Sequence, residues 1–345
     1  MTRILGRRAA DDPDAPTGHL GAYRARDGSP GARVRIDLDR PHAGLVVGKR
    51  GYGKSYTLGV LAEELARVEG AVPVVADPMG VFESLAEVGA TVVSRPRVSA
   101  AALGPRAWCD LLGLAPESPV GALVWQAADA RDSLAAMREF VAAADTRAER
   151  ATRRAAENHL ALADSWGGFE PDGLTADDLL GESAVVVDLS GLDAAPANAV
   201  LRGLAGGLYD RCVRGSPDRL PWLLVDEVHA FFDGVAAPAL RTALTRGRQP
   251  GVSFVGATQR PSALPGVAVS QADLLLAHRL TSRADLGALA DARPTYVASS
   301  LDERLPDAPG EVLLVDDATE SVHAVRIRER ETPHGGGSSR ASEIG

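Results

Sequence analysis

Lysine is nearly absent from this sequence of 345 residues: Lys49 and Lys54 are the only two, and arginine replaces lysine everywhere else. Aromatic residues make up only 4% of the chain, which requires a core of alanine, valine and leucine. The two cysteines, Cys109 and Cys212, have no metal-type spacing and indicate small core residues in a reducing compartment. No apolar run has the length of a membrane span, and no apolar stretch follows the arginines of residues 1–10. We therefore expect a soluble, cytoplasmic protein without a secretion signal.

The charge balance is acidic, with a formal net charge of −9. Such a surface does not attract nucleic acid as a whole, so any DNA contact requires a local arginine cluster. Hydrophobic residues make up 45% of the chain, which is enough for a sizeable core. The length corresponds to one large domain or two ordinary ones.

Both lysines lie in one glycine-rich stretch, whose sequence is Gly48-Lys49-Arg50-Gly51-Tyr52-Gly53-Lys54-Ser55. It fits the pattern G-x-x-x-x-G-K-[ST] of the phosphate-binding loop, or P-loop. The glycines allow a tight curl with N–H groups directed at a phosphate, Lys54 reaches the β- and γ-phosphates, and the Ser55 hydroxyl is placed to ligate Mg²⁺. A lysine at position 54 is consistent with a site where a planar guanidinium cannot replace an ammonium. We expect this whole stretch, together with Tyr56, to contact a bound nucleotide.

The residues on either side provide the context that this motif requires. Ala43–Val47 is a short apolar run of the kind that forms a buried strand. From Ser55 to Val68, leucine and valine recur at helical spacing. The alternative is a glycine-rich turn without a ligand, and the order of strand, loop and helix disfavours it.

A second apolar run, Pro221–Val225, ends in the acid pair Asp226-Glu227. Downstream of a P-loop, such a pair is the second half of an ATPase signature. The alternative is an ordinary strand, because acid pairs are also common at strand ends. In this arrangement Asp226 holds the Mg²⁺ shell and Glu227 polarises the attacking water. The sequence therefore predicts ATP and Mg²⁺ as cofactors, with Ser55 and Asp226 on the metal.

Two further strand ends carry polar residues, and each has an alternative interpretation. Asp77 follows the predicted strand Val72–Ala76, where it either faces the ligand crevice of an open α/β sheet or forms a turn before a proline. Gln259 follows the predicted strand Gly251–Gly256, where it is either a sensor of the γ-phosphate or part of an ordinary turn.

Alternating strands and helices predict the α/β fold class, with a mostly parallel sheet and helices on both faces. The expected parts are an irregular N-terminal segment (1–40), a core (41–98 and 183–328), a helical insertion (99–182) and a flexible C-terminal tail (329–345). Val34–Leu38 alternates apolar and charged residues and predicts one edge strand in the first part. Thr319–Ile327 also alternates and predicts an antiparallel edge strand.

The insertion is rich in alanine and arginine, and it contains two predicted helices, Ser133–Ala143 and Thr146–Ala163. The second helix carries a row of arginines: Arg147, Arg150, Arg153 and Arg154. We favour a solvated face on which these arginines pair with Glu149 and Glu157. The alternative is a face that contacts phosphates.

Three segments together resemble the HerA/FtsK superfamily of P-loop ATPases: GKRGYGKS, LLVDE, and RGRQPGVSFVGATQRPSALP. The element ATQRPS is the most specific of them, and Arg326–His334 is similar to the C-terminal stretch of HerA-type proteins. The resemblance covers about residues 41–98 and 183–334. Two family features are missing, because about 40 residues cannot hold the N-terminal barrel of HerA proteins and the membrane spans and winged helix of FtsK proteins are not visible.

The resemblance implies a RecA-like core, a hexameric ring, ATP hydrolysis at subunit interfaces, and translocation of double-stranded DNA through the central channel. By position, Gln259 is similar to the family's sensor amide. Arg248 lies where the family carries an arginine finger that reaches a neighbour's nucleotide, and Arg246 is the next candidate. The alternative for Arg248 is a surface arginine packed on Gln249.

We therefore expect a Mg²⁺-dependent ATPase motor whose partners are its own copies, DNA, and a nuclease or another protein, with no membrane contact. The alternative function is a nucleotide-switched assembly or scaffold factor that does not translocate DNA. A GTPase is disfavoured, because the acid pair suits ATP-driven motors and no N-K-x-D motif is present.

Overall fold

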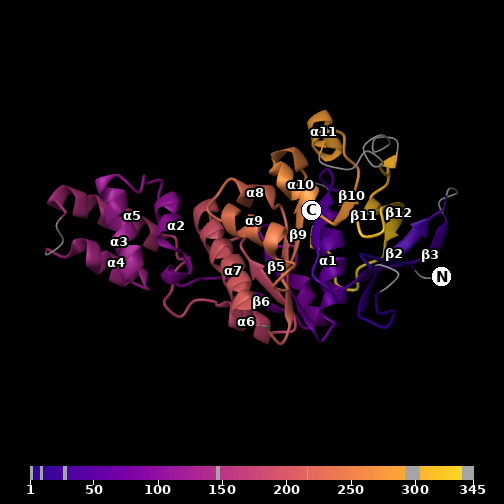
Figure 1. Ribbon diagram of the computed structural model, residues 1–345, viewed down its shortest axis with the longest axis horizontal. Coiled ribbons are helices and arrows are strands. Elements are labelled where there is room, and N and C mark those ends of the chain that lie inside the picture. Colours follow the sequence, from indigo (N-terminus) through magenta and orange to yellow (C-terminus); the bar gives the residue numbers. More distant parts are fainter. Residues whose placement is uncertain are drawn as a thin grey trace, which may run out of the picture.

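A computed structural model describes residues 3–7, 11–25, 29–144, 148–215, 217–291 and 304–335. The strands within these residues are β1 (Arg3–Leu5), β2 (Thr17–Arg24), β3 (Pro30–Asp37), β4 (Ala43–Val47), β5 (Ala71–Asp77), β6 (Thr91–Val93), β7 (Val185–Asp188), β8 (Leu220–Val225), β9 (Ser253–Thr258), β10 (Leu274–Ala277), β11 (Glu311–Asp316) and β12 (Ser321–Ile327). They form one sheet in the order β1-β3-β2-β12-β11-β10-β4-β9-β8-β5-β7-β6. The helical lobe and the N-terminal strands lie at opposite ends of the molecule (Figure 1).

The half of the sheet from β10 to β6 is parallel throughout. Its central strands β4, β5 and β9 are buried along their whole length, as expected for parallel strands covered on both faces. The predicted α/β fold with a mostly parallel sheet is confirmed. Because parallel strands place their carboxyl ends at one edge, the loops after β4, β8 and β9 meet there.

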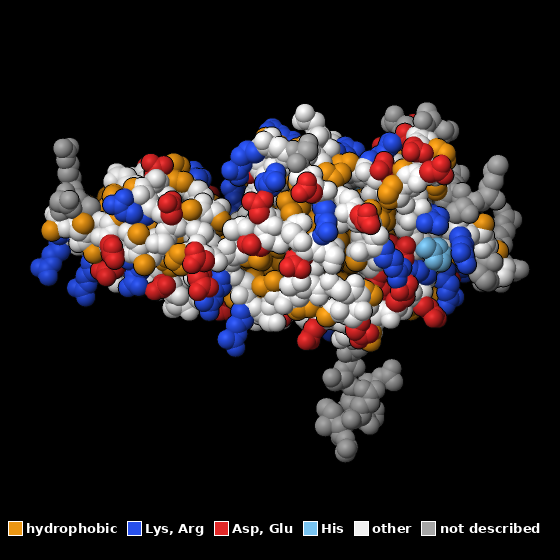
Figure 2. All heavy atoms as spheres, turned by 90° about the horizontal axis from the view of Figure 1, so that it is seen from below, with side chains coloured by type: hydrophobic (Ala, Val, Ile, Leu, Met, Phe, Trp, Pro, Cys, Tyr) orange, Lys and Arg blue, Asp and Glu red, His pale blue; other side chains and the backbone are white. Residues whose placement is uncertain are grey.

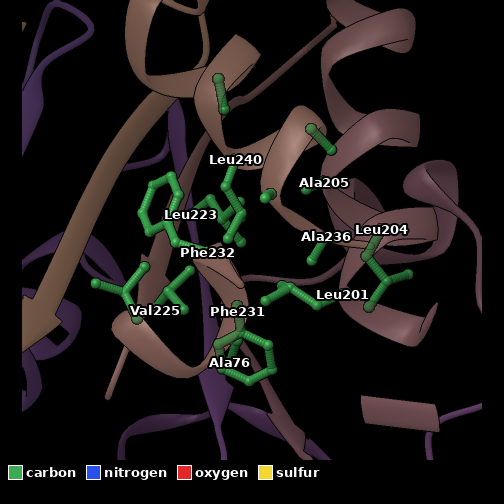
Figure 3. Packing of buried hydrophobic residues seen from close by; sticks show 14 of the residues in the cluster. Ala76, Leu201, Leu204, Ala205, Leu223, Val225, Phe231, Phe232, Ala236 and Leu240 are labelled. Carbon is green, nitrogen blue, oxygen red and sulfur yellow. The ribbon is translucent and has the colours of Figure 1, made fainter. Parts of the chain in front are cut away.

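Helices cover both faces of this parallel half. The α-helices are α1 (Lys54–Leu65), α2 (Pro105–Leu111), α3 (Pro119–Ala130), α4 (Leu134–Ala142), α5 (Arg150–Ser165), α6 (Ala176–Gly181), α7 (Ala194–Arg214), α8 (His229–Phe232), α9 (Ala237–Arg246), α10 (Gly266–Gln271) and α11 (Arg283–Asp291), with short 3₁₀ helices η1 (Glu83–Val88), η2 (Ala100–Ala102) and η3 (Pro261–Ala263). On one face, Leu58 and Leu61 of α1 pack against Val46 of β4. On the other face, α7, α8 and α9 pack against β8, as Figure 3 shows for Leu204, Phe232 and Leu223.

The other half of the sheet corrects two expectations about the termini. Residues 1–40 were expected to be irregular apart from one edge strand, yet they contribute β1, β2 and β3, and β3 lies inside the sheet. The segment 319–327 is antiparallel as predicted, but β12 lies between β11 and β2 and is no edge strand. Strand β2 was not predicted because it contains glycines where an apolar pattern would be expected. Gly21 allows close contact with β12, since a Cβ there would lie 2.0 Å from the Arg326 carbonyl oxygen.

Between β6 and β7 the chain forms the helices α2 to α6, most of which make up the lobe at the left of Figure 1. Serine hydroxyls cap two of them: Ser118 accepts a hydrogen bond from Gly121 N, and Ser133 accepts one from Ala136 N. The predicted helix Thr146–Ala163 is α5, although residues 145–147, including Arg147, lie outside the described part.

The expected ion pairs on α5 are not formed. Within the described residues, Arg150, Arg153 and Arg154 make no ion pair with Glu149 or Glu157, and Arg153 instead donates a hydrogen bond to the Ala148 carbonyl. Ion pairs between long side chains on an exposed helix contribute little stability, which explains why these arginines remain solvated.

Two expectations from composition are met. Cys109 and Cys212 are free and buried. Among the described residues, no helix combines the length and the apolar character that crossing a membrane requires.

Candidate nucleotide-binding site

The P-loop connects β4 to α1 at the carboxyl edge of the parallel sheet. Gly53 caps α1 with φ of 107°, a left-handed conformation that favours glycine. Gly48 passes so close to the residue after β10 that a Cβ there would lie 2.5 Å from His278 Cβ. Gly48 is therefore required by the packing beneath the loop, and Gly53 by its backbone conformation.

Lys54 is a mostly buried cation. The whole residue is only 6% exposed, and none of the described residues forms an ion pair with it. Burial lowers the pKa of Lys54, while Glu227 and Asp226 partly offset this effect from a distance. An unpaired buried ammonium is costly, and a bound phosphate would remove that cost.

Ser55 and Asp226 are joined directly, with the Ser55 hydroxyl donating a 2.6 Å hydrogen bond to Asp226 Oδ2. Asp226 is fully buried, and its other carboxylate oxygen accepts a hydrogen bond from Glu227 N. Burial raises the pKa of Asp226, and the bond from Ser55 opposes this shift. The structure thus brings together the two residues that the sequence predicted as Mg²⁺ ligands. The described chain contains no cluster of three or more acidic, histidine or cysteine side chains that could hold a metal, so a cation here would need oxygens from the nucleotide and water.

Glu227 has a strained backbone and an unsatisfied carboxylate oxygen. Its φ is 43°, unusual for a residue other than glycine, and Oε2 is buried without a hydrogen bond. The pKa of Glu227 is raised, mainly by burial and also by the nearby Asp226 carboxylate, while Lys54 opposes this shift. A carboxylate with a raised pKa and a free lone pair is suited to accept a proton from water.

His229 is a neighbour of Glu227 that the sequence interpretation missed. Its Nδ1 lies 3.3 Å from Glu227 Oε2 and 3.1 Å from the hydroxyl of Thr258. The ring therefore connects the acid pair after β8 to the end of β9. Its position two residues after Glu227 was the available signal.

Gln259 follows Thr258 at the same edge of the sheet. Thr258 pairs with Val47, and Gly48 N donates a hydrogen bond to the Thr258 carbonyl, so Gln259 lies next to the start of the P-loop. The side chain of Gln259 is half-buried. This position is consistent with the predicted sensor role, which stays a prediction.

Arg248 lies at the opposite edge of the sheet. Its Nη1 is 3.4 Å from Oδ2 of Asp273, which precedes β10 and accepts a hydrogen bond from Ala43 N at the start of β4. The structure therefore does not bring Arg248 to the P-loop of its own chain. Arg246, the last residue of α9, is exposed.

Asp77 uses its carboxylate in a turn. Oδ1 accepts a hydrogen bond from Met79 N and Oδ2 accepts one from Phe82 N. The predicted turn is thus confirmed.

The other P-loop residues form the rim and the floor of the site. The Lys49 ammonium lies 4.5 Å from the centre of the Tyr52 ring, and Arg50 is exposed. The floor is His278, which sequence reasoning missed: it is fully buried and its Nε2 is 3.0 Å from the Thr57 hydroxyl. Burial and the nearby Lys54 lower the pKa of His278 to about 3, so the ring beneath the loop is neutral.

These residues fit a Mg²⁺-nucleoside triphosphate. Among the described residues, Lys54 has no ion-pair partner and Glu227 Oε2 has no hydrogen-bond donor, and the Ser55–Asp226 pair offers oxygens to a hard cation. The sheet order and this site define the class: a RecA-like P-loop ATPase fold. The chain belongs to the HerA family, because residues 19–204, more than half of its length, match the model of the HerA helicase central domain.

Solved structures share this fold. VirB4 of Thermoanaerobacter pseudethanolicus is similar at 16% sequence identity and a TM-score of 0.67, over 97% of this chain and 99% of that one. The plasmid coupling protein TrwB in complex with ADP and Mg²⁺ is similar at 13% identity and a TM-score of 0.61, over 93% of this chain and 95% of that one. No curated protein matches the chain. At such identities the likeness shows the fold alone.

Proposed function

We propose that this protein is a Mg²⁺-dependent ATPase motor of the HerA/FtsK type that moves double-stranded DNA through a ring of its own copies. The observation that carries the proposal is the unpaired Lys54 ammonium next to the Ser55–Asp226 pair and the unsatisfied Glu227. These four groups are what phosphoryl transfer to water requires.

Each residue has a defined task in this proposal. Lys54 and the P-loop N–H groups bind the β- and γ-phosphates, and Ser55 and Asp226 hold Mg²⁺, which neutralises charge on the phosphates. Glu227 orients a water and takes its proton. Gln259 contacts the γ-phosphate. His229 contacts both Glu227 and Thr258, the residue before Gln259, and so connects the sensor to the base.

The ring assembly rests on Arg248. The side chain is 44% exposed at the sheet edge away from its own P-loop, where a neighbouring subunit can be reached. Transition-state charge on the γ-phosphoryl group requires a cation, and an arginine supplied by a neighbour is a known solution. We propose a hexamer on the basis of the family.

DNA is the proposed cargo because the matching family model is that of a helicase and the similar TrwB is a plasmid coupling protein. The surface in Figure 2 mixes acidic and basic side chains, so contact with DNA would come from a local cluster lining the channel. We also place the protein in the cytoplasm, where ATP and chromosomal or plasmid DNA are found together.

Electron microscopy tests this proposal directly. The protein is mixed with duplex DNA and a slowly hydrolysed ATP analogue, and the proposal predicts six-membered rings with density in the channel. Particles that remain single chains under these conditions would contradict the ring.

A second function, a nucleotide-switched assembly factor that does not move DNA, is favoured by the acidic net charge of −9. Such a factor would hydrolyse ATP at one rate with or without DNA.

A further inference from the structure

The last described residues of the chain, Arg328–Gly335, cross helix α1 and are named here the C-terminal strap. Residues from 329 onward were expected to be a flexible tail, but Thr332 is only 3% exposed. The anchor is Glu63, a fully buried carboxylate on α1 that accepts hydrogen bonds from Glu331 N, Thr332 N and the Thr332 hydroxyl. Because a buried carboxylate needs such donors, the strap is a fixed part of the α1 surface.

The strap also reaches the first turn of α1. Arg330 N donates a 2.6 Å hydrogen bond to the hydroxyl of Tyr56, the residue directly after Ser55. The Arg330 guanidinium lies over Gly59, where a Cβ would be 2.6 Å from Cζ. The strap therefore lies along α1 as far as Tyr56, two residues after Lys54.

His334, near the end of the strap, has a defined orientation and protonation. Its ring centre is 5.5 Å from that of Tyr56, edge to face, and Arg330 Nη1 is 3.3 Å from its Nδ1. A guanidinium can only donate, so Nδ1 accepts and the ring proton resides on Nε2. Partial burial and Arg330 lower the pKa of His334, which agrees with a neutral ring near pH 7. A neutral ring with one N–H donor suits a base or a ribose better than a phosphate.

A hollow opens next to His334. Its volume is about 450 Å³, within the range of small-molecule sites, and its walls come from residues 80–87 after β5 and from Pro333, His334 and Gly335 of the strap. His334 itself is exposed, so one side of its ring is accessible. His334 therefore belongs to the wall of this hollow and also contacts the ring of Tyr56 on α1.

We propose that the C-terminal strap is the nucleoside subsite of the nucleotide-binding site, with His334 contacting the ribose or base of a nucleotide whose phosphates lie on the P-loop. This inference rests on the proposed nucleotide binding and adds the residue that recognises the nucleoside. Ring contacts with a base are worth enough for about a tenfold change in affinity.

The test compares two ligands that differ only in the nucleoside. Binding of ATP and of inorganic tripolyphosphate is measured by calorimetry for the wild type, for His334→Ala, and for His159→Ala. The last variant is a matched control, because His159 lies on α5 in the helical lobe. The inference predicts that His334→Ala weakens ATP binding about tenfold or more and leaves tripolyphosphate binding within about twofold of the wild type.

Two outcomes would overturn the inference. If His334→Ala weakens both ligands equally, the strap acts on the phosphates; if it weakens neither, His334 does not contact the nucleotide. Failure of the wild type to bind either ligand would instead refute the proposed function, and the two failures are therefore distinguishable.

Discussion

The Ser55 hydroxyl donates a 2.6 Å hydrogen bond to Asp226, joining two residues that are 171 positions apart in the chain. The contact closes the P-loop against the end of β8 and places both proposed Mg²⁺ ligands side by side. Lys54 and Glu227 flank this pair, so four groups with complementary tasks meet at one edge of the sheet.

The first prediction concerns the cost of keeping Lys54 buried. Lys54→Met should lower ATP affinity by at least about tenfold, because a charged contact to the phosphates is lost. The same change should raise the melting temperature of the nucleotide-free protein, because it removes a charge that burial disfavours. Calorimetric binding and thermal unfolding measure the two effects. Unchanged ATP affinity would disprove the site assignment.

The second prediction separates binding from chemistry. Glu227→Gln keeps the shape of the side chain and loses its ability to accept a proton. We expect ATP affinity close to the wild-type value and turnover reduced by at least about a hundredfold. Steady-state turnover and calorimetric binding are compared on the same preparation. Persistent turnover would place the general base elsewhere.

The third prediction concerns Arg248 and the neighbouring subunit. Arg248→Ala should bind ATP normally and be inactive alone, because its cation serves a site on another copy. Mixing it with inactive Lys54→Ala should restore part of the activity, since some interfaces then pair an intact loop with an intact arginine. Fluorescence transfer between labelled copies first establishes subunit exchange. No recovery despite exchange would count against a shared site.

The parts of the fold that the sequence revealed are those with strong local signals. The run before Gly48 and the run before Asp226 are uniformly apolar, so both core strands were predictable, as was the P-loop between strand and helix. Strand β2 carries Gly18 and Gly21, which provide close contacts instead of apolar periodicity.

Residues that act through tertiary contacts were not predictable. His278, directly after β10, supports the P-loop although it is 221 positions away from its partner Thr57. The contact between Glu63 and Thr332 spans 269 positions, so no local sequence pattern predicts the C-terminal strap. His42 likewise gains its partners Asp37 and Asp273 only in the folded sheet.

The fourth prediction follows from His42. Burial alone would lower its pKa, but the carboxylates of Asp273 and Asp37 raise it to about 9 from the ordinary 6.5. The folded protein thus holds this proton more tightly than the unfolded chain. The stabilisation is complete below about pH 6.5 and is lost as the pH rises toward 9. His42→Gln should show a flatter decline in the free energy of unfolding between these values, measured by denaturant titration. Equal slopes for both proteins would contradict the assignment.

The steady-state rate of ATP hydrolysis, measured with and without duplex DNA, decides whether the protein is an ATPase that works on DNA. We expect that the wild type hydrolyses ATP, that duplex DNA raises the rate, and that Glu227→Gln abolishes both the basal and the stimulated rate. A wild-type rate that duplex DNA leaves unchanged would contradict the motor and favour the nucleotide-switched assembly factor.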